Sequence, residues 1–396
     1  MKTTINYLSG MLCALLLCVG LMFAGCTEGP LGDDQNTEQG GNDNNGGENG
    51  GQETPESEAV DISKAGTANS YVVSTAGSYK FTPTKGNSNT SVGSVASVAV
   101  LWESFGTYVT PNVGDLVKEI KYENGVIKFK TADTFKEGNA VIAAKDASGN
   151  ILWSWHIWLT DQPEGQVYYN NAGTMMDRNL GATSATPGDI GAHGLLYQWG
   201  RKDPFLCAMS AQTSIDAEST LAWPSAVTSD SSTGKIEYAI LHPTTFIAQN
   251  NKNYDWYYTG SQDTDITRWT ESSSPKSIYD PCPAGWRVPD GGFNGVWAKA
   301  LGSSSSFSGY PVDSTNYGIN FSGALGSASA IWYPTSGHRS PKDGDLSGTQ
   351  SYGYYWSASH SGLKSAHMFF FNGGDIDSLA NVADCAEGCS VRCIKE

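Results

Sequence analysis

Basic residues are scarce in this chain of 396 residues, which has 24 Lys and Arg against 40 Asp and Glu and a formal net charge of −16. A surface of this charge repels polyanions, so we expect no nucleic-acid partner. Nine of the acidic residues, and none of the basic ones, fall in residues 27–58. About half of the excess negative charge therefore belongs to one short segment.

The chain also lacks an apolar run long enough to cross a bilayer, which takes about 20 residues. The apolar run from Met11 to Phe23 is shorter, follows Lys2, and leads into an Ala-Gly-Cys tripeptide that ends at Cys26. A positive start, a short apolar core and small residues before a cysteine are typical of a bacterial lipoprotein signal peptide. We therefore predict that residues 1–26 are this signal, that Cys26 is acylated, and that its lipid anchors the protein in a membrane.

Aromatic residues are absent from residues 27–58, which are rich in Gly, Asn and acids. Such a segment cannot bury enough surface to offset the entropy of ordering it, so it is predicted to be a disordered tether. Asp33 and Asp34 resemble the export signal that sends lipoproteins of Bacteroidota to the outer face of the cell outer membrane, and we expect the protein to face outward there. A plain solvated spacer is the alternative for these two residues.

Cysteine is sparse once the signal is removed, leaving Cys207, Cys282, Cys385, Cys389 and Cys393. Five is an odd number, so at least one thiol stays unpaired. The last three are four residues apart, which differs from the Cys-x2-Cys spacing common in zinc sites. We interpret these cysteines as structural.

Motifs for catalysis are missing: there is no Gly-x-Ser-x-Gly, His-Glu-x-x-His, phosphate loop or dinucleotide fingerprint. We therefore predict a protein that is not an enzyme, although a glycosidase needs only two carboxylates, which no pattern excludes. No cofactor is predicted. Calcium is the one cation left open, because there are Asp-x-Asp pairs at Asp263 and Asp265, Asp343 and Asp345, and Asp375 and Asp377. Solvated turns are the alternative for each pair.

Residues 59–162 alternate apolar and polar side chains between turn residues, as antiparallel strands do. Around Asn124-Gly125, a two-residue hairpin would place Tyr122 opposite Ile127 and Ile120 opposite Phe129, with all four on one buried face. Glu119 would face Lys130 on the wet side. Strands of this length and number predict an immunoglobulin-like β-sandwich.

The last strand of this region, residues 151–159, has two apolar faces. Trp153, Trp155, Ile157 and Leu159 share the face predicted to be core. The opposite face, which includes His156 and Trp158, is predicted to pack against the following domain, with a ligand platform as the alternative. His156 lacks neighbouring metal ligands in the sequence, so we interpret it as a packed histidine.

Residues 163–396 are dense in Trp and Tyr among Gly, Ser and Asn, and show one helical stripe, at Phe293, Trp297 and Leu301 within a helix predicted over 292–301. Several motifs follow one another there in a recognisable order. They are Met176-Asp177-Arg178-Asn179-Leu180, Gly194-Leu195-Leu196-Tyr197-Gln198-Trp199-Gly200-Arg201, Asp280-Pro281-Cys282-Pro283-Ala284-Gly285-Trp286-Arg287-Val288-Pro289, Tyr317-Gly318-Ile319-Asn320-Phe321, Tyr354-Tyr355-Trp356-Ser357-Ala358-Ser359, Ala366-His367-Met368-Phe369-Phe370 and Ser390-Val391-Arg392-Cys393-Ile394. As a set they resemble the Fibrobacter succinogenes major paralogous domain family.

The resemblance implies a C-type lectin-like fold for residues 163–396, and a disulfide between Cys282 and Cys393. The chain as a whole would then be mainly β, with an immunoglobulin-like sandwich followed by an α+β domain. The family occurs on secreted and surface proteins of Bacteroidota and Fibrobacterota. The order of tether, sandwich and C-terminal domain looks like surface lipoproteins and pilus-associated proteins of gut Bacteroidota. Within this domain, the sugar-binding and calcium-binding motifs of calcium-dependent lectins are absent.

Aromatic side chains beside polar ones suit sugar rings, which stack on flat faces while their hydroxyls form hydrogen bonds. Two clusters of this kind are candidates for ligand binding, with core packing as the alternative for both. They are Tyr254, Trp256, Tyr257, Tyr258, Arg268 and Trp269, and then Trp332 with Tyr333.

These features together predict an outer-membrane surface lipoprotein that acts in recognition or adhesion and binds a glycan, or a host or matrix protein, through its C-terminal domain. The alternative is a structural tip or anchor subunit of a pilus-like appendage, whose partners would be other pilus subunits.

Overall fold

The computed structural model describes residues 58–250, 254–260, 265–302, 306–308, 312–321, 331–362, 364–379 and 382–396. Strands make up 36% of these residues and helices 6%, so the chain is mainly β, as predicted. The described residues belong to one compact unit. The predicted signal peptide with Cys26, and the predicted tether up to residue 57, lie outside the described residues.

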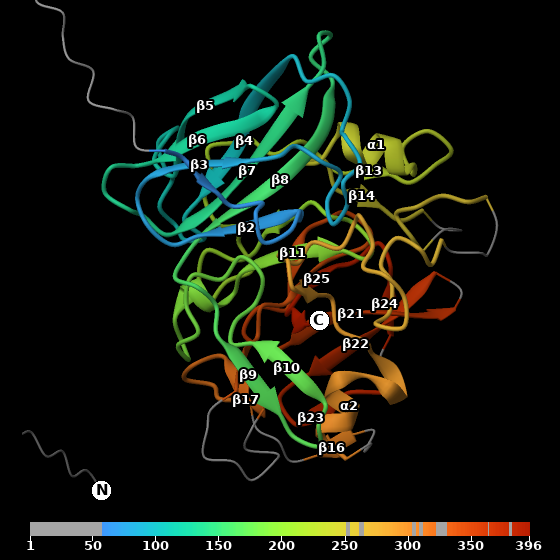
Figure 1. Cartoon of the computed structure of the whole chain (residues 1–396). Helices are drawn as coiled ribbons and strands as arrows, with labels where there is room; N and C mark the ends of the chain where they lie inside the picture. The colour runs from blue at the N-terminus through green and yellow to red at the C-terminus, as the bar shows by residue number, and fades with distance from the viewer. Residues whose placement is uncertain are drawn as a thin grey trace, which may run out of the picture. The chain divides into compact units, whose positions relative to one another are not determined.

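Eight strands occupy the region predicted to be a sandwich, and they form two four-stranded sheets, ordered β1-β3-β6-β5 and β2-β8-β7-β4 (Figure 1). The side chains between the two sheets form one apolar core, in which Phe81 and Phe129 of the first sheet meet Trp155 and Ile157 of the second. The strands are β1 (Val60–Asp61), β2 (Ser70–Val73), β3 (Ser78–Phe81), β4 (Ser97–Ser104), β5 (Val117–Glu123), β6 (Val126–Thr131), β7 (Gly138–Lys145) and β8 (Ile151–Leu159).

The hairpin of β5 and β6 turns at Asn124-Gly125, where both residues have positive φ, of 52° and 80°. Tyr122 pairs with Ile127, as predicted. Ile120 packs against the core that contains Ile127 and Phe129, as predicted, but it has no simple cross-strand partner, because β5 has a bulge between Lys118 and Lys121. The bulge twists the strand, so Tyr122 keeps 37% of its surface exposed instead of joining the core.

The two faces of β8 are both buried, as predicted. Trp153 and Trp155 belong to the core between the two sheets. On the other face Trp158 packs in the core of the C-terminal region, and its indole N–H donates to the carbonyl of Ala182 at 2.9 Å. His156 is packed as predicted, with 1% of its surface exposed. The first eight strands therefore share an extensive apolar contact with the rest of the chain.

The C-terminal region is built on two larger sheets, ordered β15-β26-β10-β9 and β12-β11-β25-β21-β22-β23-β16, with β19, β20 and β24 attached to the second. Two short pairs, β13-β14 and β17-β18, also occur among its described residues. The strands are β9 (Gly165–Tyr168), β10 (Gly173–Met176), β11 (Leu195–Gln198), β12 (Phe205–Leu206), β13 (Val227–Thr228), β14 (Ile247–Ala248), β15 (Trp286–Arg287), β16 (Ser306–Ser308), β17 (Gly318–Asn320), β18 (Trp332–Pro334), β19 (His338–Arg339), β20 (Leu346–Ser347), β21 (Gly353–Gly362), β22 (Ser365–Phe371), β23 (Asp375–Asp377), β24 (Val382–Asp384), β25 (Gly388–Ser390) and β26 (Ile394–Lys395).

Helices are short, and the predicted helix over 292–301 is interrupted. It consists of a 3-10 turn, η2 (Gly292–Asn294), and α2 (Val296–Ala300). A side chain at Gly295 would lie 2.5 Å from the Cα of Gly291, so the chain makes a tight turn there. Trp297 and Leu301 are buried as the stripe predicts, whereas Phe293 is 67% exposed because it precedes the break. The described part of the chain also contains the helices η1 (Ile190–Ala192) and α1 (Ile236–Leu241).

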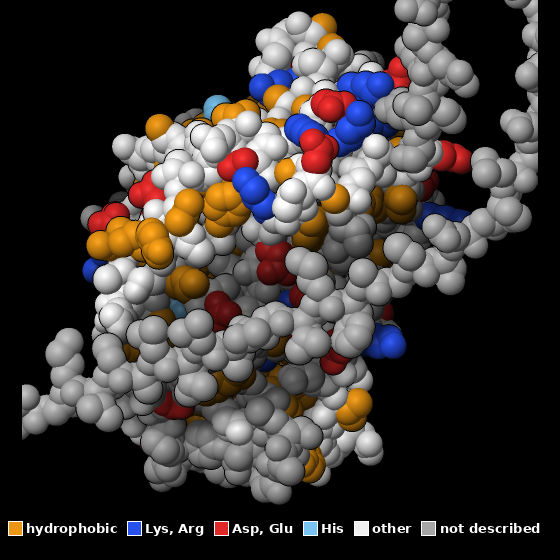
Figure 2. Space-filling view, turned by 90° about the vertical axis from the view of Figure 1, so that its left-hand side faces the viewer, with side chains coloured by type: hydrophobic (Ala, Val, Ile, Leu, Met, Phe, Trp, Pro, Cys, Tyr) orange, Lys and Arg blue, Asp and Glu red, His pale blue; other side chains and the backbone are white. Residues whose placement is uncertain are grey.

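Charges of both signs are interleaved on the outer side of the sheet β1-β3-β6-β5. Lys130 pairs with Glu119 at 2.6 Å, as predicted, and Lys118 pairs with Asp133 at 2.8 Å. Figure 2 shows basic and acidic side chains mixed on the upper part of the face it presents. No helix among the described residues is long and apolar enough to cross a membrane.

Candidate functional site

The first aromatic cluster predicted to bind a ligand is largely core. Trp256, Arg268 and Trp269 have 1%, 0% and 0% of their surface exposed. The guanidinium of Arg268 pairs with the carboxylate of Asp255, which is also fully buried. The indole N–H of Trp256 donates to the carbonyl of Trp199 at 2.7 Å. These three residues cannot reach a ligand in the folded protein, so their assignment to a binding surface was wrong.

The physical reason is that the Arg268 guanidinium occupies the place beside the aromatic rings that a ligand would take. Its guanidinium lies 5.0 Å from the ring centroid of Trp199, 4.8 Å from that of Trp256 and 5.3 Å from that of Tyr257. The aromatic faces and the carboxylate that suggested a sugar-binding surface therefore contact a buried cation instead. Tyr254 alone stays substantially exposed, at 49%, while Tyr257 and Tyr258 are half-buried.

The second predicted cluster is also internal. Trp332 is 6% exposed and Tyr333 is fully buried. The Tyr333 hydroxyl lies 2.6 Å from that of Tyr168 and accepts a hydrogen bond from the Trp297 indole at 2.9 Å. The guanidinium of Arg392 stands over the Tyr333 ring, 3.8 Å from its centroid. The prediction for Trp332 and Tyr333 was therefore wrong as well, because both side chains are buried and internal partners occupy the hydroxyl and the ring face of Tyr333.

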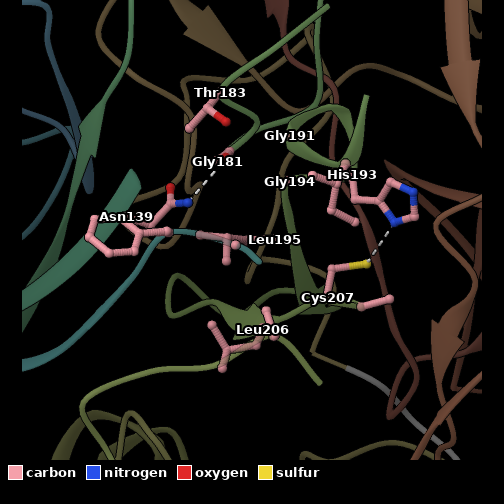
Figure 3. A pocket seen from close by; sticks show the side chains of 14 residues that line it. Asn139, Gly181, Thr183, Gly191, His193, Gly194, Leu195, Leu206 and Cys207 are labelled. Carbon is pink, nitrogen blue, oxygen red and sulfur yellow. Dashed lines mark hydrogen bonds between the residues drawn. The ribbon is translucent and has the colours of Figure 1, made fainter. Parts of the chain in front are cut away.

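A crevice between the sandwich and the C-terminal region brings Cys207 close to His193 (Figure 3), with 3.8 Å between Sγ and Nδ1. Burial raises the pKa of Cys207 to about 12 and lowers the pKa of His193 to about 4. Both groups are therefore neutral at pH 7, and the thiolate that a cysteine nucleophile requires does not form. The free space is about 10 Å³, room for roughly one water molecule. This crevice is a packed junction with no room for a substrate.

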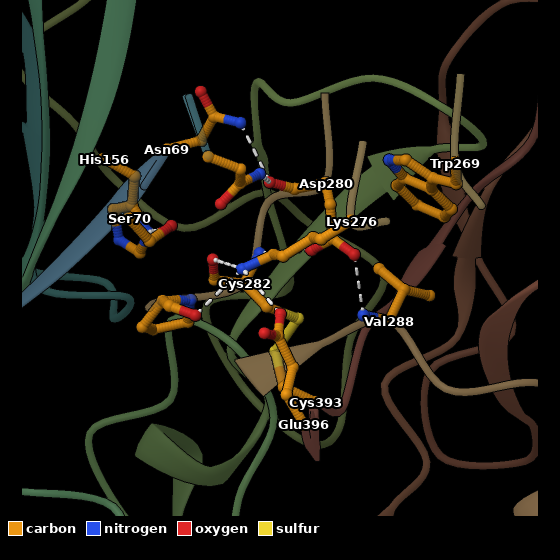
Figure 4. The surroundings of a disulfide bond; sticks show 12 residues. Asn69, Ser70, His156, Trp269, Lys276, Asp280, Cys282, Val288, Cys393 and Glu396 are labelled. Carbon is orange, nitrogen blue, oxygen red and sulfur yellow. Dashed lines mark hydrogen bonds and ion pairs between the residues drawn. A yellow bond between two sulfur atoms is a disulfide. The ribbon is translucent and has the colours of Figure 1, made fainter. Parts of the chain in front are cut away.

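Cys282 and Cys393 form a disulfide, the bond that the resemblance implies (Figure 4). The surrounding groups tie the bond to the sandwich. Asp280 accepts hydrogen bonds from the backbone N–H groups of Cys282 and Val288 at 2.9 Å each, and its carbonyl accepts one from the Asn69 amide at 2.8 Å. The disulfide is thus part of the framework, and neither of its cysteines lines the hollow described below.

The Asp-x-Asp pairs within the described residues serve as turn acceptors. Asp343 accepts the backbone N–H of Asp345 at 3.1 Å, and Asp377 accepts that of Leu379 at 3.0 Å. Asp265 accepts the N–H of Thr267, and Asp263 lies outside the described residues. No group of three His, Cys, Asp or Glu side chains gathers as metal ligands in the part of the chain that the structure describes.

A hollow of about 390 Å³ opens on the surface of the C-terminal region, in the size range of small-molecule pockets. Three loops form it: one that leads into β17, one that leads into β21, and the turn between β22 and β23. We call it the tyrosine hollow, after Tyr317 and Tyr352. Its described lining is Val312, Ser314, Tyr317, Gln350, Ser351, Tyr352, Asn372 and Gly373.

The lining of the tyrosine hollow combines two tyrosine rings with their hydroxyls, two amides and two serine hydroxyls, and none of these residues is charged. Tyr352 is 38% exposed, while Tyr317 and Asn372 are half-buried. An open, uncharged hollow with aromatic faces and hydrogen-bonding groups can hold a polar ligand by stacking and hydrogen bonds. Its described lining contains no Asp, Glu, His, Cys or Lys side chain.

The chain has no match among protein-family models, curated proteins or solved structures.

None of the residues of the tyrosine hollow was predicted as a ligand contact. Tyr317 lies in one of the recognised motifs, and Tyr352 lies two residues before another. The available signal was the pair of Tyr residues beside polar turn residues, a weaker pattern than the dense Trp and Tyr clusters. Density of aromatics identified the core, whereas isolated aromatics in loops mark this hollow.

Proposed function

We propose that this protein is a surface lipoprotein of the cell outer membrane that recognises a ligand without catalysis, and that the ligand is a glycan or a host or matrix protein bound by the C-terminal region. The observation that carries the proposal is the tyrosine hollow, which is open, of ligand size and uncharged. An enzyme would need an acid, a base or an activated nucleophile at such a place. The described lining has aromatic faces, amides and hydroxyls, which suit binding, and no Asp, Glu, His, Cys or Lys to activate those hydroxyls.

The anchoring part of the proposal rests on the sequence. Acylation at Cys26 would fix the chain to a membrane, and the acidic segment at 27–58 would hold the folded part away from it. In this arrangement the tether separates the C-terminal region from the membrane and lets it meet ligands outside the cell.

One observation favours the alternative role, a structural subunit of a pilus-like appendage. The loop between β4 and β5 exposes Tyr108 by 74%, Val109 by 46% and Val113 by 84%. Apolar side chains grouped on one loop are suited to contact with another protein chain. In that role the sandwich would carry the main contacts.

A binding screen with the mature chain tests the proposal. Residues 27–396, purified without the lipid, would be applied to an array of glycans and of extracellular-matrix proteins. We expect binding to one ligand class. Absence of binding by folded protein to every glycan and protein on the array, together with co-purification of pilus subunits from cells, would favour the appendage role.

A further inference from the structure

The tyrosine hollow has a composition that selects among ligands. It is lined by neutral groups, although the protein as a whole carries a net charge of −16. We propose that this hollow binds an uncharged saccharide unit without a metal ion, with Tyr352 as the stacking surface. This inference rests on the proposed recognition function and assigns its site and ligand class.

Packing against two neighbouring aromatic rings holds the ring of Tyr352 in place. Its centroid lies 6.0 Å from that of Phe370 with the planes nearly parallel, at 20°, and 6.0 Å from that of Tyr354. Gly348, with φ of +73°, lets the ring approach closely, since a Cβ there would lie 2.8 Å from Cδ2 of Tyr352. A ring fixed by these neighbours and still 38% exposed loses little entropy when a sugar stacks on it.

The amide groups of the hollow complement sugar hydroxyls, which both donate and accept hydrogen bonds. Asn372 Oδ1 accepts the backbone N–H groups of Gly374 and Asp375 at 3.3 Å each, so its Nδ2 remains to donate. Gln350 Nε2 donates to the carbonyl of Gln212, so its Oε1 remains to accept. One donor and one acceptor are thus fixed at the hollow, which matches a pair of hydroxyl groups.

The backbone of the hollow adopts an unusual conformation at two residues. Tyr317 has φ of 52° and Gln350 has φ of 83°, both in the left-handed region that side chains rarely adopt. Buried Thr335 holds both segments. Its N–H and its hydroxyl donate to the carbonyl of Tyr317 at 2.8 Å and 2.9 Å, and its own carbonyl accepts the N–H of Gln350 at 3.4 Å. Such conformations carry a cost in free energy and concentrate at binding sites, where the surrounding structure holds them.

Charged ligands fit another hollow better. A space of about 310 Å³ beside α2 is lined by Arg287, Lys299 and Lys395 together with Asp290 and Glu396, among others. An acidic sugar would find cations there and none in the lining of the tyrosine hollow. Calcium would also lack ligands in the tyrosine hollow, because its described lining contains no carboxylate. We therefore expect the tyrosine hollow to prefer neutral ligands and the hollow beside α2 to prefer acidic ones.

The test is calorimetric titration of residues 27–396 with methyl glycosides of glucose, galactose, mannose and N-acetylglucosamine, and separately with N-acetylneuraminic and glucuronic acids, each with and without EDTA. We expect at least one neutral glycoside to bind, with an affinity that EDTA changes by less than twofold. Tyr352→Ala and Asn372→Ala should each weaken this binding by tenfold or more. Tyr122→Ala, which removes a tyrosine of similar exposure (37%) from the sandwich, is the matched control and should bind as wild type does.

Several results would overturn the inference: binding of the acidic sugars alone, loss of binding in EDTA, or wild-type affinity in a folded Tyr352→Ala. Circular dichroism and urea unfolding identify variants that fail to fold, and Asn372→Ala provides a second probe if Tyr352→Ala is one of them. If the array finds a protein or an acidic glycan and no neutral saccharide binds, this inference fails and the proposed function stands. If nothing binds in either experiment, both fail.

Discussion

His156 shows, at the scale of a single residue, how packing fixes a side chain's charge. Its Nε2 lies 2.9 Å from the Asn139 Oδ1, which can only accept, so Nε2 carries the proton. Its Nδ1 then accepts from the Ser70 hydroxyl at 3.0 Å. Burial lowers the pKa of His156 from 6.5 to about 3. The neutral form is therefore the one that the fold stabilises.

This shift predicts acid sensitivity. Because the folded pKa lies below the unfolded one, the stability from neutral His156 is complete above pH 6.5 and declines as the pH falls toward about 3. At pH 5 the loss from this group is about 2 kcal/mol relative to pH 8. His156→Gln should be less stable than wild type at pH 8, yet lose about 2 kcal/mol less between pH 8 and pH 5. Urea unfolding at both pH values measures this, and equal losses in the two proteins would contradict it.

Single residues also show where sequence reasoning ends. Alternation placed Trp153 and Trp155 in the sandwich core correctly, because a strand's two faces follow from its own sequence. Trp256 and Arg268 lie in irregular segments, where no period separates a covered side chain from an exposed one. Their coverage comes from Trp199, distant in the chain, and this contact exists only once the fold has formed.

At the scale of elements, the turn of the β5-β6 hairpin requires a residue that can adopt positive φ. Gly125 has φ of +80°, and no atom lies within 4 Å of where a Cβ would stand, so a substitution there changes backbone conformation alone. Gly125→Ala should lower the free energy of unfolding by about 1–2 kcal/mol. Gly374→Ala is the matched control, since it is equally open and lies outside the left-handed region. Its effect should stay within about 0.5 kcal/mol, or be stabilising. Similar losses in both variants, measured by urea unfolding, would show that the turn is not specifically demanding.

The same hairpin shows which features of an element the sequence could predict and which it could not. Asn-Gly and the alternating side chains were sufficient for the turn and for the pairing of Tyr122 with Ile127. The bulge depends on Glu119, whose φ of 52° is rare for such a residue and carries no local signal. The break at Gly295 is similar: the apolar stripe continued across it, while the close approach to Gly291 is a property of the folded chain.

At the scale of the whole molecule, one sheet joins the two ends of the C-terminal region. Met175 of β10 and Arg287 of β15 both pair with Ile394 of β26, two residues before the end of the sequence given. The disulfide from Cys282 to Cys393 closes 111 residues of chain beside this sheet. Neither cysteine lines the tyrosine hollow, so the bond contributes to stability and leaves the ligand contacts to the loops.

This separation of framework from site predicts the result of removing the bond. The double variant Cys282→Ala with Cys393→Ala should lower the free energy of unfolding by about 2–5 kcal/mol, because closing a long loop restricts the unfolded chain. Its affinity for a neutral glycoside should stay within twofold of wild type, since the loops around Tyr352 are held by their own hydrogen bonds.

Cys207, Cys385 and Cys389 are buried and unpaired, so all three should react with iodoacetamide only after unfolding. Peptide mapping without reductant tests the arrangement of the cysteines, and a bond between Cys385 and Cys389 would contradict it. A double variant that unfolds at the same urea concentration as wild type would contradict the stabilising role of the bond between Cys282 and Cys393.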